Sequence, residues 1–321
     1  MVLCLFFQLF SLQEPVTSSS RYCIIASGDG RVIASSNGDA VQSVASISKI
    51  MTAMIAIEEG NLEEKWNVSK DIVQHAIGSS VYLKPKQSVT LQSLLYGLLL
   101  RSGNDAAYEI AVHIAGSEAK FVKLMNAKAD AIGMRNTVFT NASGLDEDGV
   151  GNRSTACDMA VLMQYALKND QFRKIIATKY YTTEWKIRWK NKNRLLFTFP
   201  FLTGGKTGYT KQAGRTLITS ARKGALESIV VTLNMQDDFA FHQMKHTEVL
   251  NAYQSEMILK KGIYYFGNQQ ATLHENVYFT RQKEELLPQI SLYLKDNELI
   301  LESADPGKFL QTWKLEKRRK Q

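Results

Sequence analysis

The sequence predicts a mixed α/β (α+β) protein in which a mainly antiparallel sheet packs against helices, followed by a small β-rich C-terminal domain. Two pairs of short apolar stretches flank Asp29-Gly30 and Lys223-Gly224, and such pairs are typical of β-hairpins. Between them lie segments whose apolar residues recur every three or four positions, as on the buried face of a helix. Beyond about residue 256, apolar and polar residues alternate instead, which indicates strands.

The elements are expected in a simple order along the chain. A first hairpin covers 21–36, and a second covers 215–221 and 227–233. The periodic segments predict helices over 46–57, 91–100, 106–115, 117–132, 155–168 and 239–253. Thr90, Asp105 and Thr155 stand where helix caps are expected. Aromatic and β-branched residues around 180–189 and 195–199 indicate further strands.

Composition limits the class of protein. The chain has 321 residues, a net charge of +8 and a pI of about 9.2. That charge suits nucleic acid, anionic lipid or an anionic wall polymer, but no recognition-helix or zinc-finger pattern supports a nucleic-acid partner. Three scattered cysteines are too few for a disulfide framework. His242 and His246 are expected on a solvated helix face, so neither metal nor any other cofactor is predicted.

The first twenty residues resemble a leader segment. Residues 2–10 form an apolar run whose length suits the hydrophobic region of a signal peptide and is too short to span a bilayer as a helix. The usual positive residues before the run are missing. We expect an exported protein, with 1–20 as its signal or leader segment.

The stretch that begins the first predicted helix carries a possible nucleophile and base. Ser46 and Lys49 lie three residues apart, so they share a helix face, and a hydroxyl beside an amine can act as a nucleophile–base pair. The pattern alone is weak, because Ser117-x-x-Lys120 and Ser220-x-x-Lys223 also match it. A plain helix cap followed by a solvated lysine would look the same.

Two further motifs follow, one some fifty residues after Lys49 and the other about a hundred residues later. Ser102-Gly103-Asn104 lies between two predicted helices, and Lys206-Thr207-Gly208 precedes the second hairpin. Each alone fits an ordinary helix end or strand edge. Together with Ser46-x-x-Lys49, in this order and spacing, they match the set found in penicillin-binding proteins and class A β-lactamases.

On these motifs the chain closely resembles the low-molecular-mass penicillin-binding proteins, which are serine-type D-alanyl-D-alanine carboxypeptidases of bacterial cell walls. Stretches 45–53, 102–107 and 205–210 carry the resemblance, and 141–145 and 154–158 are similar too. It covers about 21–255 as the catalytic domain and weakens over 256–321, where that family often has a β-rich stalk. The resemblance implies an α/β sandwich of the β-lactamase/transpeptidase type, with a helical subdomain carrying Ser102 to Asn104.

The resemblance also implies roles for these residues. Ser46 would attack the carbonyl between two D-alanines, with Lys49 as base, and Ser102 would relay a proton to the leaving amine. A free lysine has a pKa of about 10.4, so Lys49 must be shifted by roughly three units to be neutral near pH 7. Burial and a second cation, Lys206, are expected to supply that shift.

The remaining residues would bind the substrate. Asn104 would contact the substrate's peptide amide, and Lys206 and Thr207 would position the substrate, with Thr207 near its terminal carboxylate. Gly208 would let the substrate backbone approach, and the backbone N–H groups of Ser46 and Tyr209 would form the oxyanion hole. The expected partners are peptidoglycan stem peptides ending in D-Ala-D-Ala, with β-lactams as inhibitors.

Several points stay open at the level of sequence. The family's carboxylate-binding arginine is absent from 241–246, where Lys245 or His242 would have to replace it. The alternatives are a β-lactamase, disfavoured by Gly103 in place of Asp, and a non-turnover β-lactam sensor or wall-binding protein. The expected location is the outer face of the cytoplasmic membrane or the wall. The basic tail after Trp313 is a candidate for peripheral contact with anionic lipid.

Overall fold

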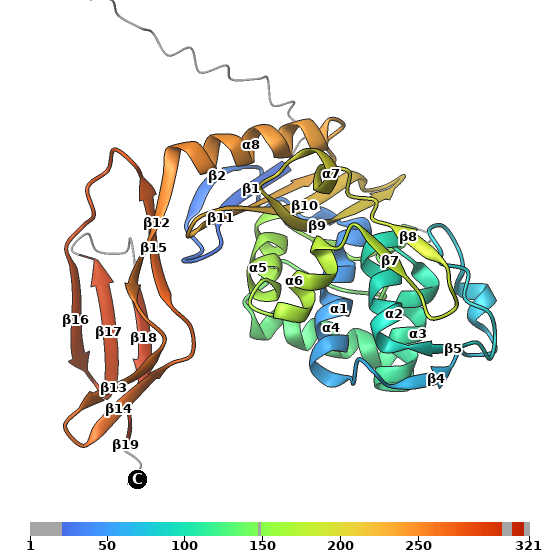
Figure 1. Cartoon of the computed structure of the whole chain (residues 1–321), viewed down its shortest axis with the longest axis horizontal. Coiled ribbons are helices and arrows are strands. Elements are labelled where there is room, and N and C mark those ends of the chain that lie inside the picture. The colour runs from blue at the N-terminus through green and yellow to red at the C-terminus, as the bar shows by residue number, and fades with distance from the viewer. Residues whose placement is uncertain (1–20, 147–148, 304–309, 318–321) are drawn as a thin grey trace, which may run out of the picture.

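The computed structural model describes residues 21–146, 149–303 and 310–317, so the predicted leader and the last four residues lie outside the described part. Figure 1 shows a larger body of sheet and helices, and beside it an elongated β-rich part built from the C-terminal strands.

The centre of the larger body is a five-stranded antiparallel sheet with the order β2-β1-β11-β10-β9. Its strands are β1 (Arg21–Ala26), β2 (Val32–Ser36), β9 (Leu202–Thr210), β10 (Gly214–Lys223) and β11 (Leu226–Leu233). Both predicted hairpins are therefore present. The sheet also brings the first strands of the chain against strands about two hundred residues later, which only the folded chain reveals.

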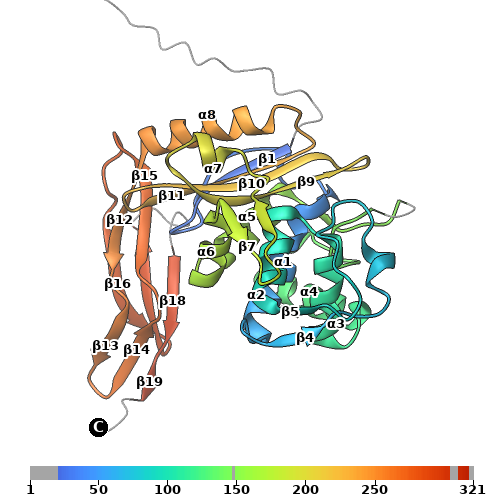
Figure 2. The ribbon, with the colours of Figure 1, turned by 45° about the vertical axis from the view of Figure 1, so that its right-hand side comes forward.

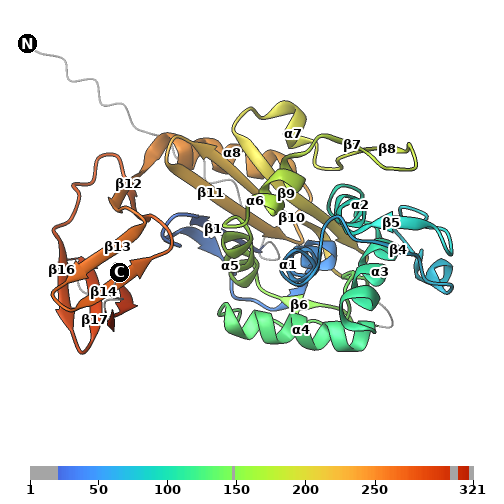
Figure 3. The same ribbon diagram turned by 60° about the horizontal axis from the view of Figure 1, so that its bottom comes forward.

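Successive side chains along these strands point to opposite faces of the sheet, and each face has its own hydrophobic core. Ile24 and Val230 lie in a cluster with Leu250 of helix α8 (Asp238–Ala252), whereas Ile25 and Val231, one residue further on, lie in a larger cluster on the opposite face. This period of two is what a sheet covered on both faces requires. Figure 3 shows α8 on one side of the sheet and α1, α5 and α6 on the other. The predicted antiparallel sheet between helices is confirmed.

The helical part lies between β3 and β9 in the sequence. It comprises η1 (Ala45–Ser48), α1 (Lys49–Glu59), η2 (Ile72–His75), α2 (Leu91–Tyr96), η3 (Gly97–Arg101), α3 (Asn104–Ala115), α4 (Glu118–Ala131), α5 (Ala156–Ala166), α6 (Asp170–Ala177) and α7 (Leu195–Thr198). Short strand pairs join parts of it: β3 (Gln42–Ser43) with β6 (Arg153–Ser154), β4 (Lys65–Asn67) with β5 (Ser88–Thr90), and β7 (Tyr180–Thr182) with β8 (Arg188–Lys190).

Local capping signals mark several helix starts correctly. The side chains of Thr90, Ser117 and Thr155 each accept a hydrogen bond from the backbone N–H three residues on, which satisfies a donor that the first turn leaves unpaired. Asp105 was expected to cap in the same way, and that prediction is wrong. It lies inside the first turn of α3, and its carboxylate instead accepts hydrogen bonds from Ser80 and from the backbone of the 81–83 segment.

Three other predictions need correction. Residues 195–199, expected as a strand, contain the short helix α7, because a short apolar run fits either element. Helix α6 was not predicted, although Asn169 caps it through its side chain. His242 and His246 do not face solvent, since both are fully buried under α8. Hydroxyl groups on the sheet satisfy them: Thr219 contacts both rings, and Thr232 and Ser228 contact one each.

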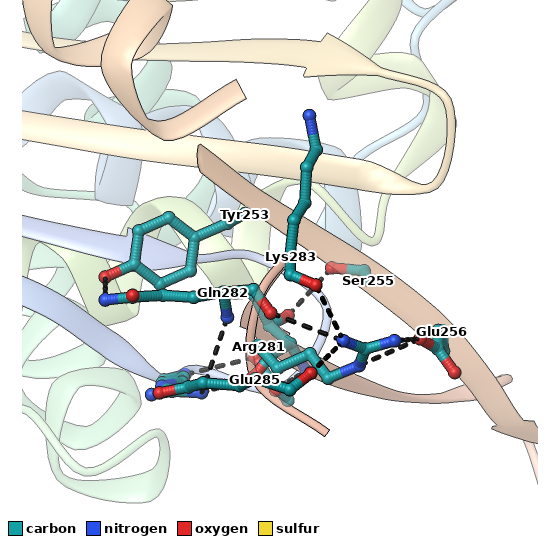
Figure 4. Close-up of polar contacts among 10 residues, drawn as sticks. Tyr253, Ser255, Glu256, Arg281, Gln282, Lys283 and Glu285 are labelled. Carbon is teal, nitrogen blue, oxygen red and sulfur yellow. Dashed lines mark hydrogen bonds and ion pairs between the residues drawn. The ribbon is translucent and has the colours of Figure 1, made fainter. Parts of the chain in front are cut away.

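The C-terminal part consists of short antiparallel strands, as the alternating pattern predicts. They are β12 (Tyr253–Leu259), β13 (Gly262–Phe266), β14 (Gln269–Leu273), β15 (Val277–Gln282), β16 (Ile290–Lys295), β17 (Glu298–Ser303), β18 (Leu310–Lys314) and β19 (Glu316–Lys317). A separate small core fills it, against which Trp313 packs half-buried. In Figure 4 the guanidinium of Arg281 on β15 points toward Glu256 on β12, with Nε 2.9 Å from the carboxylate Oε1.

The two parts meet at the turn between β1 and β2. Asp29 accepts a hydrogen bond from the backbone N–H of Thr280 at 2.6 Å, and Arg31 donates one to the carbonyl of the same residue at 2.7 Å. Figure 2 shows β12 and β15 running close to the end of the central sheet. Among the described residues, no helix is both long and apolar enough to cross a membrane.

Candidate active site

Ser46 lies in η1, a 3₁₀ turn that leads directly into α1. A plain helix cap was the alternative interpretation of Ser46 from the sequence. The structure does not support it, because Val44 precedes the turn and no side chain caps it. Ala45 adopts a left-handed conformation with φ of 49°, which turns the chain sharply just before Ser46. Ser46 remains half-buried in this position. Its Oγ accepts a hydrogen bond of 3.1 Å from Lys49 Nζ, so the predicted pair is in contact.

Lys49 is fully buried. Its ammonium also donates to Asn104 Oδ1 at 2.7 Å and to the backbone carbonyl of Ser143. Burial first, and then the nearby charge of Lys192, lower the pKa of Lys49 to about 7, while the charge of Asp105 opposes the change. The shift that the sequence argument required is therefore present. Its main cause is removal of the charged amine from water.

Lys206 and Ser102 form a second pair beside the first. Lys206 on β9 is almost fully buried, and its Nζ donates to Ser102 Oγ at 2.9 Å. Burial, followed by the charges of Lys49 and Lys192, holds the pKa of Lys206 well below its usual range. Ser102 itself has a φ of 64° at the end of η3. This left-handed conformation ends the helix at Ser102 and lets its side chain contact Lys206 on β9.

Gly208 lies directly against the turn that carries Ser46. A Cβ added to Gly208 would come within 3.0 Å of the Ser46 backbone nitrogen and 2.3 Å of Thr216 Oγ1. Only glycine fits this close approach of β9 to η1. The neighbouring residues Thr207 and Tyr209 are half-buried and exposed, respectively, so this edge of the sheet is open beside Ser46.

Asn104 completes the group at the start of α3. Its Oδ1 accepts from Lys49, and its Nδ2 donates to the carbonyl of Ile77 at 2.6 Å. The second hydrogen of that amide nitrogen is left for another acceptor. The structure thus brings together three separate segments of the chain, which carry Ser46 and Lys49, Ser102 and Asn104, and Lys206 and Gly208.

Two contributors to this site were missed from the sequence. Lys192, in the segment after β8, donates to Ser79 Oγ at 2.9 Å and acts on both buried lysines through its charge. The carbonyl of Ser143 acts through the backbone, and Asn141 holds its loop by accepting from the N–H groups of Ser143 and Gly144. The similarity of 141–145 to the family pointed to that loop, but no local signal marks Lys192.

The two proposed replacements for the missing arginine do not fit that role. His242 is buried between α8 and the sheet, where its ring nitrogens contact Thr219 and Thr232. Lys245 pairs with Glu248 at 2.8 Å on the outer side of the same helix. Lys192 is instead the cation that stands beside Lys49 and Lys206.

Comparison with known proteins shows the family to which the chain belongs. A family model described as D-alanyl-D-alanine carboxypeptidase, peptidase family S11, matches residues 8–237. The chain belongs to this family. It is 31% identical to D-alanyl-D-alanine carboxypeptidase DacF of Bacillus subtilis over 92% of its own length and 80% of the relative. It is 34% identical to DacC of Escherichia coli over 71% of its length, and spans about three fifths (59%) of that relative.

Solved structures agree on family and fold. Penicillin-binding protein D2 of Listeria monocytogenes, solved in a cefotaxime-bound form, is 29% identical, covers 73% of this chain and 96% of its own, and superposes with a TM-score of 0.64. Penicillin-binding protein 5 of Haemophilus influenzae gives a TM-score of 0.77 over 95% of this chain and 98% of its own, at 21% identity. The latter likeness shows the fold alone. The chain is thus a low-molecular-mass penicillin-binding protein by family and a serine-type hydrolase by class.

Proposed function

We propose that this protein removes the terminal D-alanine from peptidoglycan stem pentapeptides through an acyl-enzyme on Ser46, and that β-lactams acylate the same oxygen. The observation that carries the proposal is the contact between Ser46 Oγ and a buried Lys49 whose pKa lies near 7. A serine hydroxyl needs such a base to become a nucleophile. A lysine that titrates near the working pH is suited to take its proton and return it.

The chemistry then follows in two steps. Neutral Lys49 takes the proton of Ser46, whose oxygen attacks the carbonyl between the D-alanines. The C–N bond of the tetrahedral intermediate breaks, the leaving D-alanine amine receives a proton by way of Ser102, and an ester forms on Ser46. Water, activated by the same base, then hydrolyses the ester and regenerates the hydroxyl. Ser102 Oγ accepts a hydrogen bond from Lys206 Nζ, so Lys206 holds the relay hydroxyl in place.

Substrate binding uses both sides of Ser46. Lys206 and Lys192, with the Thr207 hydroxyl, attract the terminal carboxylate, while the remaining N–H of Asn104 donates to the peptide carbonyl before the scissile bond. The backbone N–H groups of Ser46 and Tyr209 stabilise the oxyanion. Removal of one such donor typically costs about 10²–10³ in rate.

We also infer the organisation and location of the chain. Residues 21–255 would form the catalytic domain and 256–321 the β-rich C-terminal domain, with 1–20 directing export to the outer face of the membrane or the wall. The net charge of +8 supports attraction to anionic wall polymer or lipid. Because Trp313 packs against the C-terminal core, contact of the tail with lipid would depend on its lysines and arginines.

The test is intact-protein mass spectrometry after addition of benzylpenicillin, with Ser46→Ala as the control. We expect a single adduct that maps to Ser46 and persists for many minutes, together with D-alanine release from a D-Ala-D-Ala peptide. A persistent adduct without D-alanine release would indicate a sensor. An adduct that disappears as penicillin is consumed would indicate a β-lactamase. Absence of any adduct would refute the activated Ser46–Lys49 pair.

A further inference from the structure

Two of the three cysteines lie together in the folded chain. Cys23 on β1 and Cys157 in the first turn of α5 are 134 residues apart in the sequence, yet their Sγ atoms are 2.7 Å apart. From the sequence alone, the cysteines are too scattered to indicate a framework of disulfides. The packing of α5 on β1 brings these two into contact between the helix and the sheet (Figure 3).

The surroundings of both cysteines hold them in this contact. Cys23 is fully buried in the larger core, and Cys157 is half-buried against that core. The backbone N–H of Cys157 donates to the carbonyl of Gly38 at 3.1 Å. A Cβ added to Gly38 would come within 2.8 Å of Cys157 Sγ, so glycine leaves the room in which this sulfur lies. A disulfide bond is about 2.05 Å long, and the two sulfurs need only a small further approach to form one.

We propose that Cys23 and Cys157 form a disulfide that fixes the start of α5 to the central sheet, after oxidation by a thiol–disulfide exchange partner such as glutathione disulfide. Disulfides persist outside the cytoplasm, whereas thiols in the cytosol are kept reduced. The bond is therefore expected once the protein has been exported, as its proposed function requires. Its formation in vitro does not depend on D-alanine release, so the two proposals fail separately.

The exchange takes place in two balanced steps. The Cys157 thiolate attacks one sulfur of the oxidant and expels the other as a thiolate, which takes up the proton that Cys157 lost. The Cys23 thiol then loses its proton, attacks Cys157 Sγ and expels the second glutathione thiolate, which is protonated in turn. The two protein thiols thus lose two electrons and two protons, and one glutathione disulfide becomes two molecules of glutathione.

The environments of the two thiols favour this order. Cys157 is the one that an oxidant can reach, because Cys23 is fully buried. The hydrogen bond with Cys23 lowers the pKa of Cys157, against burial and the charge of Asp39, and a position in the first turn of a helix also favours the thiolate. The same hydrogen bond, followed by burial, raises the pKa of Cys23. Cys157 is therefore the attacking thiolate and Cys23 the resolving thiol.

The bond would anchor a segment that supports the catalytic turn. Residues 152–157 lead into α5, and Asn152 at their start is fully buried. Its carbonyl accepts the N–H of Val44 at 3.1 Å, and its Nδ2 donates to Ser48 Oγ at 3.0 Å and to the carbonyl of Asn141 at 2.9 Å. Asn152 thus holds both the turn that carries the nucleophile and the loop that contacts the buried base. A cross-link at the other end of this segment restrains the site without touching the reacting groups.

The cross-link should stabilise the fold because it closes a long loop. It joins residues 134 apart, and the chain between them forms helices α1 to α4. Closing such a loop removes conformational freedom mainly from the unfolded chain. We therefore expect the Tm of the oxidised protein to exceed that of the reduced protein by roughly 4–8 °C.

The test locates the bond by peptide mapping of the full chain. The protein is equilibrated with excess glutathione disulfide, unfolded in the presence of iodoacetamide, and digested with trypsin without reductant. Cleavage after arginine and lysine places each of the three cysteines in its own peptide. We expect peptide 22–31 linked to peptide 154–168, and an intact mass lower by two hydrogen atoms. Alkylation of both cysteines, glutathione retained on either, or a link to Cys4 would overturn the proposal.

Two variants make stability a second test. Cys157→Ser should show no response of Tm to the oxidant, whereas Cys4→Ser keeps the pair and should respond as the wild type does. Benzylpenicillin acylation at room temperature should proceed at the same rate in the oxidised and the reduced protein, because neither sulfur is among the reacting groups. A linked pair without a rise in Tm, or a Tm response in Cys157→Ser, would overturn the stabilising cross-link. A change in the acylation rate on oxidation would overturn its purely structural role.

Discussion

At the scale of single residues, the site depends on how three lysines share a small volume. Lys49 and Lys206 are buried, and Lys192 is exposed nearby. Each positive charge makes protonation of the others less favourable. Lys49 can lose its proton near pH 7 because burial, the largest cause, and the charge of Lys192 both lower its pKa. A carboxypeptidase site of this kind needs no histidine to obtain a base that titrates in the physiological range.

Lys192→Gln should therefore raise the pKa of Lys49. We expect the rate of Ser46 acylation by benzylpenicillin to rise with pH as Lys49 loses its proton, with a midpoint near 7 in the wild type. We expect the midpoint to move to higher pH in the variant, and the rate at pH 7 to fall roughly two- to fivefold. The measurement is the second-order acylation rate between pH 5 and 9.

Lys186→Gln serves as the control, because Lys186 is exposed in the turn between β7 and β8. If Lys192 only attracted the carboxylate of the ligand, the rate would fall by the same factor at every pH and the midpoint would stay in place. That outcome would contradict an effect on the base.

At the scale of helices and strands, a sequence signal predicts an element when all the residues that make the signal lie within that element. The caps Thr90, Ser117 and Thr155 are such signals, because donor and acceptor lie three residues apart. The run at 195–199 is too short for its periodicity to separate strand from helix. The burial of His246 could not be predicted from the sequence of its helix. Its partners Thr219 and Ser228 lie on β10 and β11, and they contact His246 only because α8 packs on the folded sheet.

The same distinction divides the site. Ser46, Lys49 and Gly208 belong to short motifs whose chemistry is visible in the sequence, and the structure places them in contact. Lys192 contributes only a charge at a distance, and Ser143 only a backbone carbonyl. Neither contribution has a residue pattern, so the folded chain alone reveals them.

At the scale of the whole molecule, the catalytic body and the C-terminal part are joined through few polar contacts. Asp29 is central to them, because its carboxylate accepts the N–H of Thr280 on β15 at 2.6 Å and is largely shielded from water. Lys168 and Glu275 make a second contact at 2.6 Å, but both side chains are more than half exposed. A shielded charge-assisted hydrogen bond contributes more than an exposed ion pair.

Asp29→Ala should therefore loosen the C-terminal part, whereas Lys168→Ala should change little. The first substitution leaves the N–H of Thr280 without its acceptor, at a cost of about 1–3 kcal/mol, and the second should cost less than about 1 kcal/mol. Limited proteolysis followed by mass spectrometry measures this directly. We expect faster cleavage near 253–260 in Asp29→Ala, with an unchanged rate of benzylpenicillin acylation because Asp29 lies outside the catalytic group. Equal cleavage rates in the two variants would show that apolar packing, and not this hydrogen bond, holds the two parts together.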